Sequence, residues 1–185
     1  MPAKSWFKWG NAASHVFSSA DRLKCGHAPP LDMIALVQRV RRAEVEIAGA
    51  NHATIAGGIL ALVCAERGDG VNEARALAKK TVELRIFNDV EKRMNRSLID
   101  EGLELLVVPQ FTLAADTRSG RRPSFTKACE PQLAQSLFLR YVDAAREHVK
   151  CVKTGVFGAD MQVALVNDGP VTFWLRVAAN EEPVA

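Results

Sequence analysis

A chain of 185 residues is close to the usual length of one domain, and 48% hydrophobic residues suffice for a single buried core. Its 24 Lys and Arg against 21 Asp and Glu leave a net charge of only +3. This balance excludes a protein that binds nucleic acid through bulk positive charge, so any RNA contact should come from a local patch or a shaped pocket.

The cysteines favour a reduced protein. They are spaced too widely for a Cys-x-x-Cys motif, and no histidine stands near them at zinc-ligand spacing: Cys25, Cys64, Cys129 and Cys151. We expect free thiols, no metal and no other cofactor. Apolar runs stay far below the roughly 20 residues of a membrane span, so we expect a cytoplasmic chain without membrane contact.

Residues Met1–Asp32 differ in composition from the rest of the chain. They mix tryptophan and histidine with Ser, Ala, Lys and Gly, and they lack the apolar stretch of a secretory signal. Their excess of basic residues allows a transit peptide, but a disordered extension or a start placed too early is favoured, because Met33 opens the first regular strand. We predict an extension over 1–32, one domain over 33–178 and a flexible tail over 179–185.

The first predicted strands form an antiparallel meander. Ile34–Val40 is aliphatic, and apolar and charged residues then alternate up to Ile47, which is typical of a strand with one wet face. A turn signal follows at Ala48–Asn51, and further strand from Ile55 to Ala65 is interrupted at Gly57–Gly58.

A first helix is predicted behind Asn72, which can cap it. Its apolar residues recur at four-residue spacing on one face: Ala74, Ala78, Val82 and Ile86. Residues 85–96 are predicted to be irregular, and strands Ser97–Ile99 and Leu103–Leu113 to follow.

A basic loop at Thr117–Ser124 precedes a second predicted helix, for which Pro131 suits the first turn. An apolar stripe runs along that helix: Leu133, Leu137, Tyr141 and Ala145.

The chain closes on strands, at Val152–Phe157 and in two alternating segments that flank a break at Asn167–Pro170. The order strands, helix, strands, helix, strands predicts a single α/β domain. Two helices cannot cover both faces of so many strands. We expect sheet packed on sheet in a barrel-like form, with two helices on one side and a second subunit completing some sheet surface.

Familiar catalytic motifs are missing from the sequence, which has no nucleophile elbow, zinc-protease helix or phosphate-binding loop. The segment Pro109–Leu113 (PQFTL) ends a hydrophobic strand and offers Thr112 as a nucleophile, but no adjacent base activates it. This segment is either ordinary strand or a strand end that presents backbone N–H groups to a substrate.

A second segment, Asn167–Thr172 (NDGPVT), stands between two alternating runs, where Gly-Pro usually marks a turn. Proline is also the one residue whose peptide bond is readily cis. A cis bond at Gly169–Pro170 would aim consecutive carbonyl oxygens the same way and form a rigid backbone wall.

Several segments, in this order, are similar to those of the D-aminoacyl-tRNA deacylase family: Gln38–Val40, Leu84–Phe87, Met94–Asn95, Gln110–Leu113, Arg122–Phe125, Phe157–Met161 and Asn167–Thr172. The resemblance covers the chain from Met33 to about Val177. Each segment alone is weak, but their common order is specific.

The resemblance implies a homodimeric carboxylic ester hydrolase that edits aminoacyl-tRNA. D-aminoacyl-tRNA and glycyl-tRNA would be its substrates. Gly169–Pro170 of one subunit would reach into the active site of the other and reject L-amino acids, with Arg39 holding it in place. The aminoacyl group would be bound, and its hydrolysis carried out, at Gln110, Phe111 and Thr112. The terminal adenosine pocket would include Phe157 and Met161.

The resemblance also implies that the tRNA assists its own hydrolysis. The ribose 2′-OH next to the ester orients or activates water, and the protein supplies positioning. Older proposals for the family give the residue at Thr112 a nucleophilic role instead.

Two alternatives stay open at this stage. Pro109 replaces a serine that many family members have, and Pro-Gln also occurs in a relative that tolerates small L-amino acids. That relative has alanine at the position of Phe111, so Phe111 favours the D-specific branch. The other alternative is a non-catalytic nucleic-acid-binding protein, against which the modest net charge counts.

The densest basic cluster is either a solvated loop or a contact for acceptor-stem phosphates, which would make tRNA affinity depend on salt. Its members are Arg118, Arg121, Arg122 and Lys127.

Overall fold

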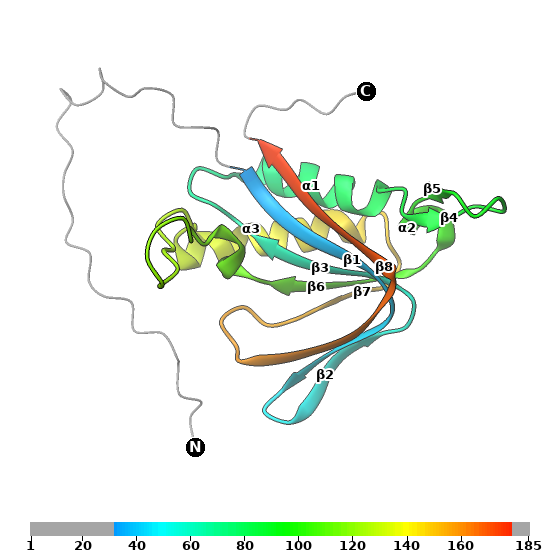
Figure 1. The fold of residues 1–185 in the computed structure, drawn as a ribbon, viewed down its shortest axis with the longest axis horizontal. Coiled ribbons are helices and arrows are strands. Elements are labelled where there is room, and N and C mark those ends of the chain that lie inside the picture. Colours follow the sequence, from blue (N-terminus) through cyan, green and yellow to red (C-terminus); the bar gives the residue numbers. More distant parts are fainter. Residues whose placement is uncertain (1–31, 179–185) are drawn as a thin grey trace.

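The computed structural model describes residues 32–178 (Figure 1). The expected extension, apart from Asp32, and the expected tail lie outside the described residues. Within 32–178 the chain forms one six-stranded mixed sheet, a separate two-stranded sheet, and helices against one face. No helix in this range is long and apolar enough to cross a membrane.

Strand β1 (Asp32–Ile47) is the spine of the sheet, because it pairs with three other strands. Its first part pairs antiparallel with β3 (Gly58–Cys64) and its second part with β2 (Ala50–Ile55). Its other edge pairs antiparallel with β8 (Met161–Ala178) along almost its whole length. The expected antiparallel meander is met in part: all pairings among the first three strands are antiparallel, but β3 returns to pair with β1 instead of β2.

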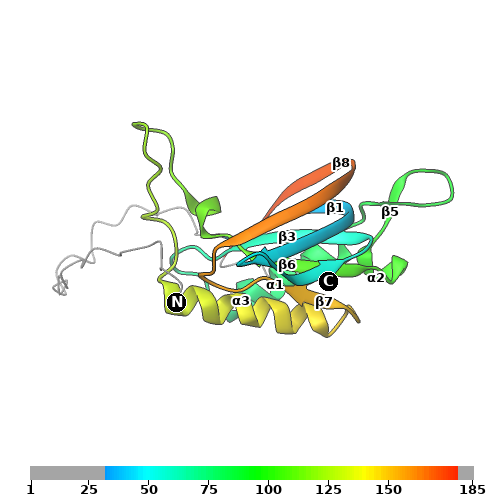
Figure 2. The same ribbon diagram turned by 90° about the horizontal axis from the view of Figure 1, so that it is seen from below.

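Two further strands make the sheet mixed. Strand β6 (Glu104–Pro109) runs parallel to β3, and β7 (Val152–Thr154) runs parallel to β6. Parallel neighbours need crossover connections, which the two long helices supply. Figure 2 shows α1 (Val71–Glu83) and α3 (Pro131–Arg146) together beneath the same face of the sheet, as predicted.

The sheet curls on itself, so it has two interiors. On the helix side, Met33, Ala35 and Val37 of β1 pack against a core that includes Leu77 of α1 and Tyr141 of α3. Inside the curl lies a second apolar cluster, whose fully buried members include Val45, Ile55, Leu60 and Leu106. The sheet-on-sheet expectation is therefore met by one nearly closed, barrel-like sheet instead of two separate sheets.

Two expected elements begin differently. Helix α1 starts at Val71 behind Gly70, so Asn72 is not its cap, and the Glu73 carboxylate accepts the Gly70 N–H instead. The predicted strand Ser97–Ile99 is wrong. Ser97 and Asp100 cap each other's N–H groups, and this reciprocal pair starts the short helix α2 (Leu98–Glu101).

Smaller corrections concern the later elements. The stretch expected to be irregular contains a short hairpin of β4 (Phe87–Asn88) and β5 (Met94–Arg96). Leu133 is 47% exposed and lies off the buried stripe of α3. Strand β7 ends at Thr154 instead of residue 157, and β8 continues through the expected break at residues 167–170.

Buried acids lie where β3 leads into α1. Glu66 and Asp69 are both almost fully buried, and one Asp69 oxygen accepts the Glu66 N–H at 2.7 Å while the other has no partner. Burial, with a smaller contribution from nearby carboxylates, raises the pKa of Asp69 from 3.8 to about 7.

Because the pKa of Asp69 is raised, the folded protein holds a proton between about pH 4 and pH 7 that the unfolded chain has lost. The stability that the protonated Asp69 contributes is fully present below pH 4 and is lost as the pH rises through 7. Asp69→Asn keeps an oxygen for the Glu66 N–H and removes the charge. We expect this variant to be more stable than the wild type at pH 8, by of the order of 2 to 4 kcal/mol.

Urea unfolding at several pH values measures this effect. Asp143→Asn, on an exposed position of α3, is the matched control and should keep the wild-type pH dependence. An Asp69→Asn protein that loses stability between pH 4 and pH 7 as steeply as the wild type would contradict the assignment.

Candidate functional site

The segment Asn167–Thr172 forms a bulge within β8. Val40 of β1 pairs with Asn167, but Gln38 pairs with Thr172, so residues 168–171 all lie opposite Arg39. The Gly169–Pro170 peptide bond is cis, and Gly169 has φ 131°, in the region that favours glycine. Both residues are exposed. We call residues 168–171 the Gly-Pro bulge.

Arg39 ties the Gly-Pro bulge to the rest of the fold. Its side chain is only 10% exposed, and its Nε lies 3.2 Å from both the main-chain oxygen and the Oδ2 of Asp168. Its other end donates to the carbonyl of Ile86, just before β4. The residue that the family resemblance singles out thus contacts the bulge directly.

Side chains at the base of the bulge brace it further. The Asn167 Oδ1 accepts the N–H of Val171 at 3.0 Å, and its Nδ2 donates to the Thr172 hydroxyl at 2.9 Å. Gln38 of β1 donates to the same hydroxyl at 3.5 Å. Both ends of the bulge are thereby held by hydrogen bonds.

The glycine of the bulge has no room for a side chain. A Cβ at Gly169 would lie 2.7 Å from Cγ2 of Val171 and 3.1 Å from a guanidinium nitrogen of Arg39. Any larger residue would push against the group that anchors the bulge.

The segment PQFTL lies elsewhere, at the end of β6. The Gln110 N–H donates to the carbonyl of Val63 at 2.8 Å, and Phe111–Ala114 then forms a 3-10 turn. The Thr112 hydroxyl is contacted by the side-chain amide of Gln110 at 2.5 Å. An amide cannot take up a proton at neutral pH, so this contact does not activate Thr112 as a nucleophile.

Phe111 is fixed in position by packing. Its ring meets Phe125 edge-on, with ring centroids 5.1 Å apart. Its carbonyl lies 3.5 Å from the Cys64 thiol, whose pKa burial raises to about 12. Cys64 is therefore a protonated packing residue, and within the described range Cys129 and Cys151 are free thiols as well.

Met161 and Phe157 lie near this strand end but pack differently. A Cβ at Gly155 would lie 2.8 Å from the Met161 sulfur and 3.4 Å from Pro109, so these three residues adjoin one another. Met161 packs on the cluster inside the curl, whereas Phe157 packs on the helix-side core. The structure thus places Met161 beside PQFTL and turns Phe157 toward another core.

A row of apolar side chains, not singled out from the sequence, crosses the sheet face opposite the helices. Leu36 pairs with Trp174 on one side and Leu62 on the other, and Leu62 pairs with Val108 of β6. Exposure falls along the row from 47% at Trp174 to 1% at Val108. The out-of-phase tryptophan in the last strand was the sequence signal for this row.

Within one chain, the Gly-Pro bulge and PQFTL lie at opposite ends of the sheet. Arg39 pairs with Ile59 of β3, whereas Gln110 bonds to Val63. The two segments are separated by four residues along β3 and by three strand spacings, from β8 to β6. These separations are perpendicular, and their diagonal is about 20 Å along the sheet. Both views place the middle of β8 and the segment after β6 at opposite ends of the large sheet (Figures 1 and 2). One chain therefore does not bring the two predicted parts of the site together.

The basic cluster lies on the long loop beyond PQFTL. Its four cationic residues are exposed. Arg118 is engaged by Asp116, with its Nε 2.9 Å from a carboxylate oxygen, and this contact lowers the pKa of Asp116. Arg121, Arg122 and Lys127 extend the positive charge of the loop.

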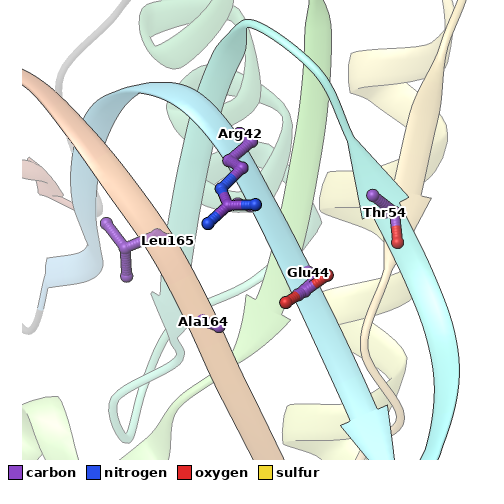
Figure 3. Close-up of a pocket in the computed structure, with 6 residues that line it drawn as sticks. Arg42, Glu44, Thr54, Ala164 and Leu165 are labelled. Carbon is purple, nitrogen blue, oxygen red and sulfur yellow. The ribbon is translucent and has the colours of Figure 1, made fainter.

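A shallow hollow of about 160 Å³ lies between β1, β2 and β8 (Figure 3). It contains none of the predicted site residues. Its lining carries one cation and one anion, Arg42 and Glu44, beside small or apolar neighbours. We assign it no role in the site.

Comparison with known proteins gives consistent matches. The family model described as D-Tyr-tRNA(Tyr) deacylase matches residues 36–176. A D-aminoacyl-tRNA deacylase from Janthinobacterium sp. (strain Marseille) is 54% identical over 145 residues, covering 78% of this chain and 97% of the relative. One from Paracoccus denitrificans (strain Pd 1222) is 53% identical over 146 residues, covering 79% of this chain and 98% of the relative.

Solved structures agree with these matches. One titled c-Myc DNA Unwinding Element Binding Protein has a TM-score of 0.75 at 35% identity, and covers 79% of this chain and 99% of its own. Another, titled as a probable eukaryotic D-amino acid tRNA deacylase, has a TM-score of 0.69 at 16% identity, with 79% and 100% covered. The second likeness concerns the fold alone.

Proposed function

Because the chain belongs to the D-Tyr-tRNA(Tyr) deacylase family and is a D-aminoacyl-tRNA deacylase, a hydrolase, we propose that two copies pair and complete each other's active sites. The Gly-Pro bulge of one copy would enter the site around Gln110–Thr112 of the other. The family matches make the chain an enzyme, which sets aside the non-catalytic alternative.

The observation that carries the proposal is the separation of the two parts within one chain. The bulge is exposed at its tip and held at its base by Arg39 and Asn167. A rigid, exposed segment of this kind is suited to insertion into the site of a second molecule. The row from Trp174 to Leu62 offers apolar surface beside PQFTL for a second copy to cover.

Selection between mirror-image substrates would then be made by main-chain atoms. A rigid wall at Gly169–Pro170 would clash with the side chain of an L-amino acid and leave room for that of a D-amino acid. Glycine has no side chain to exclude, so glycyl-tRNA would be hydrolysed as well. Phe111, locked against Phe125, supports assignment to the D-specific branch over the L-tolerant relative.

The chemistry would come largely from the substrate. Backbone groups around Phe111 would hold the aminoacyl ester, and the ribose 2′-OH would orient the attacking water. Met161, adjoining Pro109 at the strand end, would contact the terminal adenosine. The amide partner of Thr112 supports a binding role for its hydroxyl.

We expect Thr112→Ala to retain D-Tyr-tRNA hydrolysis within about tenfold of wild type, because one neutral hydrogen bond is lost. A D-Tyr-tRNA ending in 2′-deoxyadenosine should resist the wild-type enzyme, because the assisting hydroxyl is absent. Single-turnover hydrolysis measures both. Complete loss of activity in a folded Thr112→Ala protein, or rapid cleavage of the deoxy substrate, would refute this mechanism.

The basic loop is proposed to contact phosphates of the tRNA acceptor stem. Replacing Arg121 and Arg122 together by Glu should weaken tRNA binding and flatten its dependence on salt, because fewer counterions are released on binding. Titration of the tRNA at several salt concentrations measures both quantities. Arg146→Glu on α3 is an exposed control. Unchanged affinity in the loop variant would show that the loop is only solvated.

A further inference from the structure

A second arginine contacts the Gly-Pro bulge from β1. The Nε of Arg41 lies 3.0 Å from Oδ1 of Asp168, while Oδ2 of the same carboxylate lies 3.2 Å from Nε of Arg39. One carboxylate is thus held between two guanidinium groups, immediately before Gly169.

The two arginines differ in their surroundings. The Arg39 side chain is 10% exposed and that of Arg41 is 76% exposed, with Asp168 between them at 33%. An exposed ion pair contributes little to global stability, because water and salt screen it. Arg41 is therefore poorly placed to stabilise the fold but well placed to restrain one local group.

Two oxygens of Asp168 compete for the same N–H of Arg39, and Arg41 limits this competition. The Nε of Arg39 faces both the carboxylate and the main-chain carbonyl of Asp168, each at 3.2 Å. If the carboxylate were free to rotate, it would alternate with the carbonyl as the partner of that single N–H. Arg41 holds the carboxylate through its other oxygen, and this keeps the Asp168 carbonyl, and so the direction of the backbone into Gly169, in one arrangement.

We propose that Arg41, acting through Asp168, is a positioning residue for the Gly-Pro bulge and sharpens discrimination between D- and L-aminoacyl-tRNA. This inference rests on the proposed function, in which the bulge excludes L-amino acids. If the Gly-Pro bulge moved, it would admit some L-aminoacyl-tRNA. Hydrolysis of D-aminoacyl-tRNA would not change, because the bulge leaves room for the D side chain.

Salt provides an independent signature. The Arg41–Asp168 pair is exposed and should weaken as ionic strength rises. D-Tyr-tRNA and L-Tyr-tRNA carry the same tRNA, so the salt dependence of phosphate contacts cancels in the ratio of their rates. Discrimination by the wild type should therefore fall with salt, and discrimination by Arg41→Gln should respond less.

The experiment compares kcat/KM for D-Tyr-tRNA and L-Tyr-tRNA at low and high salt. Arg41→Gln should lower the D-to-L ratio about threefold to fivefold through faster L hydrolysis, as loss of an exposed ion pair allows. The kcat/KM for D-Tyr-tRNA and the melting temperature should stay unchanged. Arg41→Lys, which keeps the positive charge, should have a D-to-L ratio between those of Arg41→Gln and the wild type. Arg42→Gln is the matched control, since Arg42 is equally cationic but lines the hollow of Figure 3.

A D-to-L ratio in Arg41→Gln equal to that of the wild type would overturn the inference. So would an equal fall in Arg42→Gln, which would indicate a general charge effect. Failure of the proposed function would look different, because Gly169→Ala, whose Cβ crowds Val171 and Arg39 and displaces the bulge itself, would then also keep the wild-type ratio.

Discussion

The antiparallel pairing of β1 with β8 is the constraint on which the site depends. It runs almost the full length of both strands and is interrupted where four residues of β8 stand opposite Arg39. The interruption pushes the Gly-Pro bulge out of the sheet while the pairing on either side fixes its base. The same β1 carries β3, whose far end holds PQFTL through Val63. One strand therefore sets both parts of the site and keeps them apart, which is why a second copy is proposed to unite them.

This arrangement places selectivity in the backbone. The bulge is shaped by the buried side chain of Arg39 and by hydrogen bonds of Asn167 and Thr172 at the surface, and its tip presents main-chain atoms. PQFTL likewise leads into a tight 3-10 turn. There the Thr112 hydroxyl accepts a hydrogen bond from the Gln110 side-chain amide, which is not a base. A site of this kind binds the substrate and excludes the wrong mirror image, but supplies no acid or base. It suits a substrate whose own ribose hydroxyl takes part in the chemistry.

Much of the fold followed from periodicity, and the exceptions have local causes. The alternation along β1 and the apolar stripes of α1 and α3 predicted those elements because burial on one face imposes them. The short apolar run at Ser97–Ile99 predicts a strand because it shows no helical period, but the capping pair of Ser97 and Asp100 makes it the start of a helix. The site residues followed from the family resemblance. The contact of Arg41 with Asp168 did not, since contacts between residues far apart in the chain leave no local pattern. The row from Trp174 to Leu62 left one local sign, a tryptophan out of phase with the alternation in the last strand, but nothing in the sequence identified its partners on other strands.

The central claim, that the bulge acts across two copies, is tested most directly in a mixed dimer. One copy carries Gly169→Ala, whose Cβ would crowd Val171 and Arg39 and displace the bulge. The other keeps its bulge but carries Gln110→Ala and Phe111→Ala, which we expect to abolish hydrolysis by its homodimer. The measurement is the ratio of D-Tyr-tRNA to L-Tyr-tRNA hydrolysis by the purified mixed dimer. Our account predicts the wild-type ratio, because the one working site receives the intact bulge of its partner. A ratio as low as that of the Gly169→Ala homodimer would contradict it.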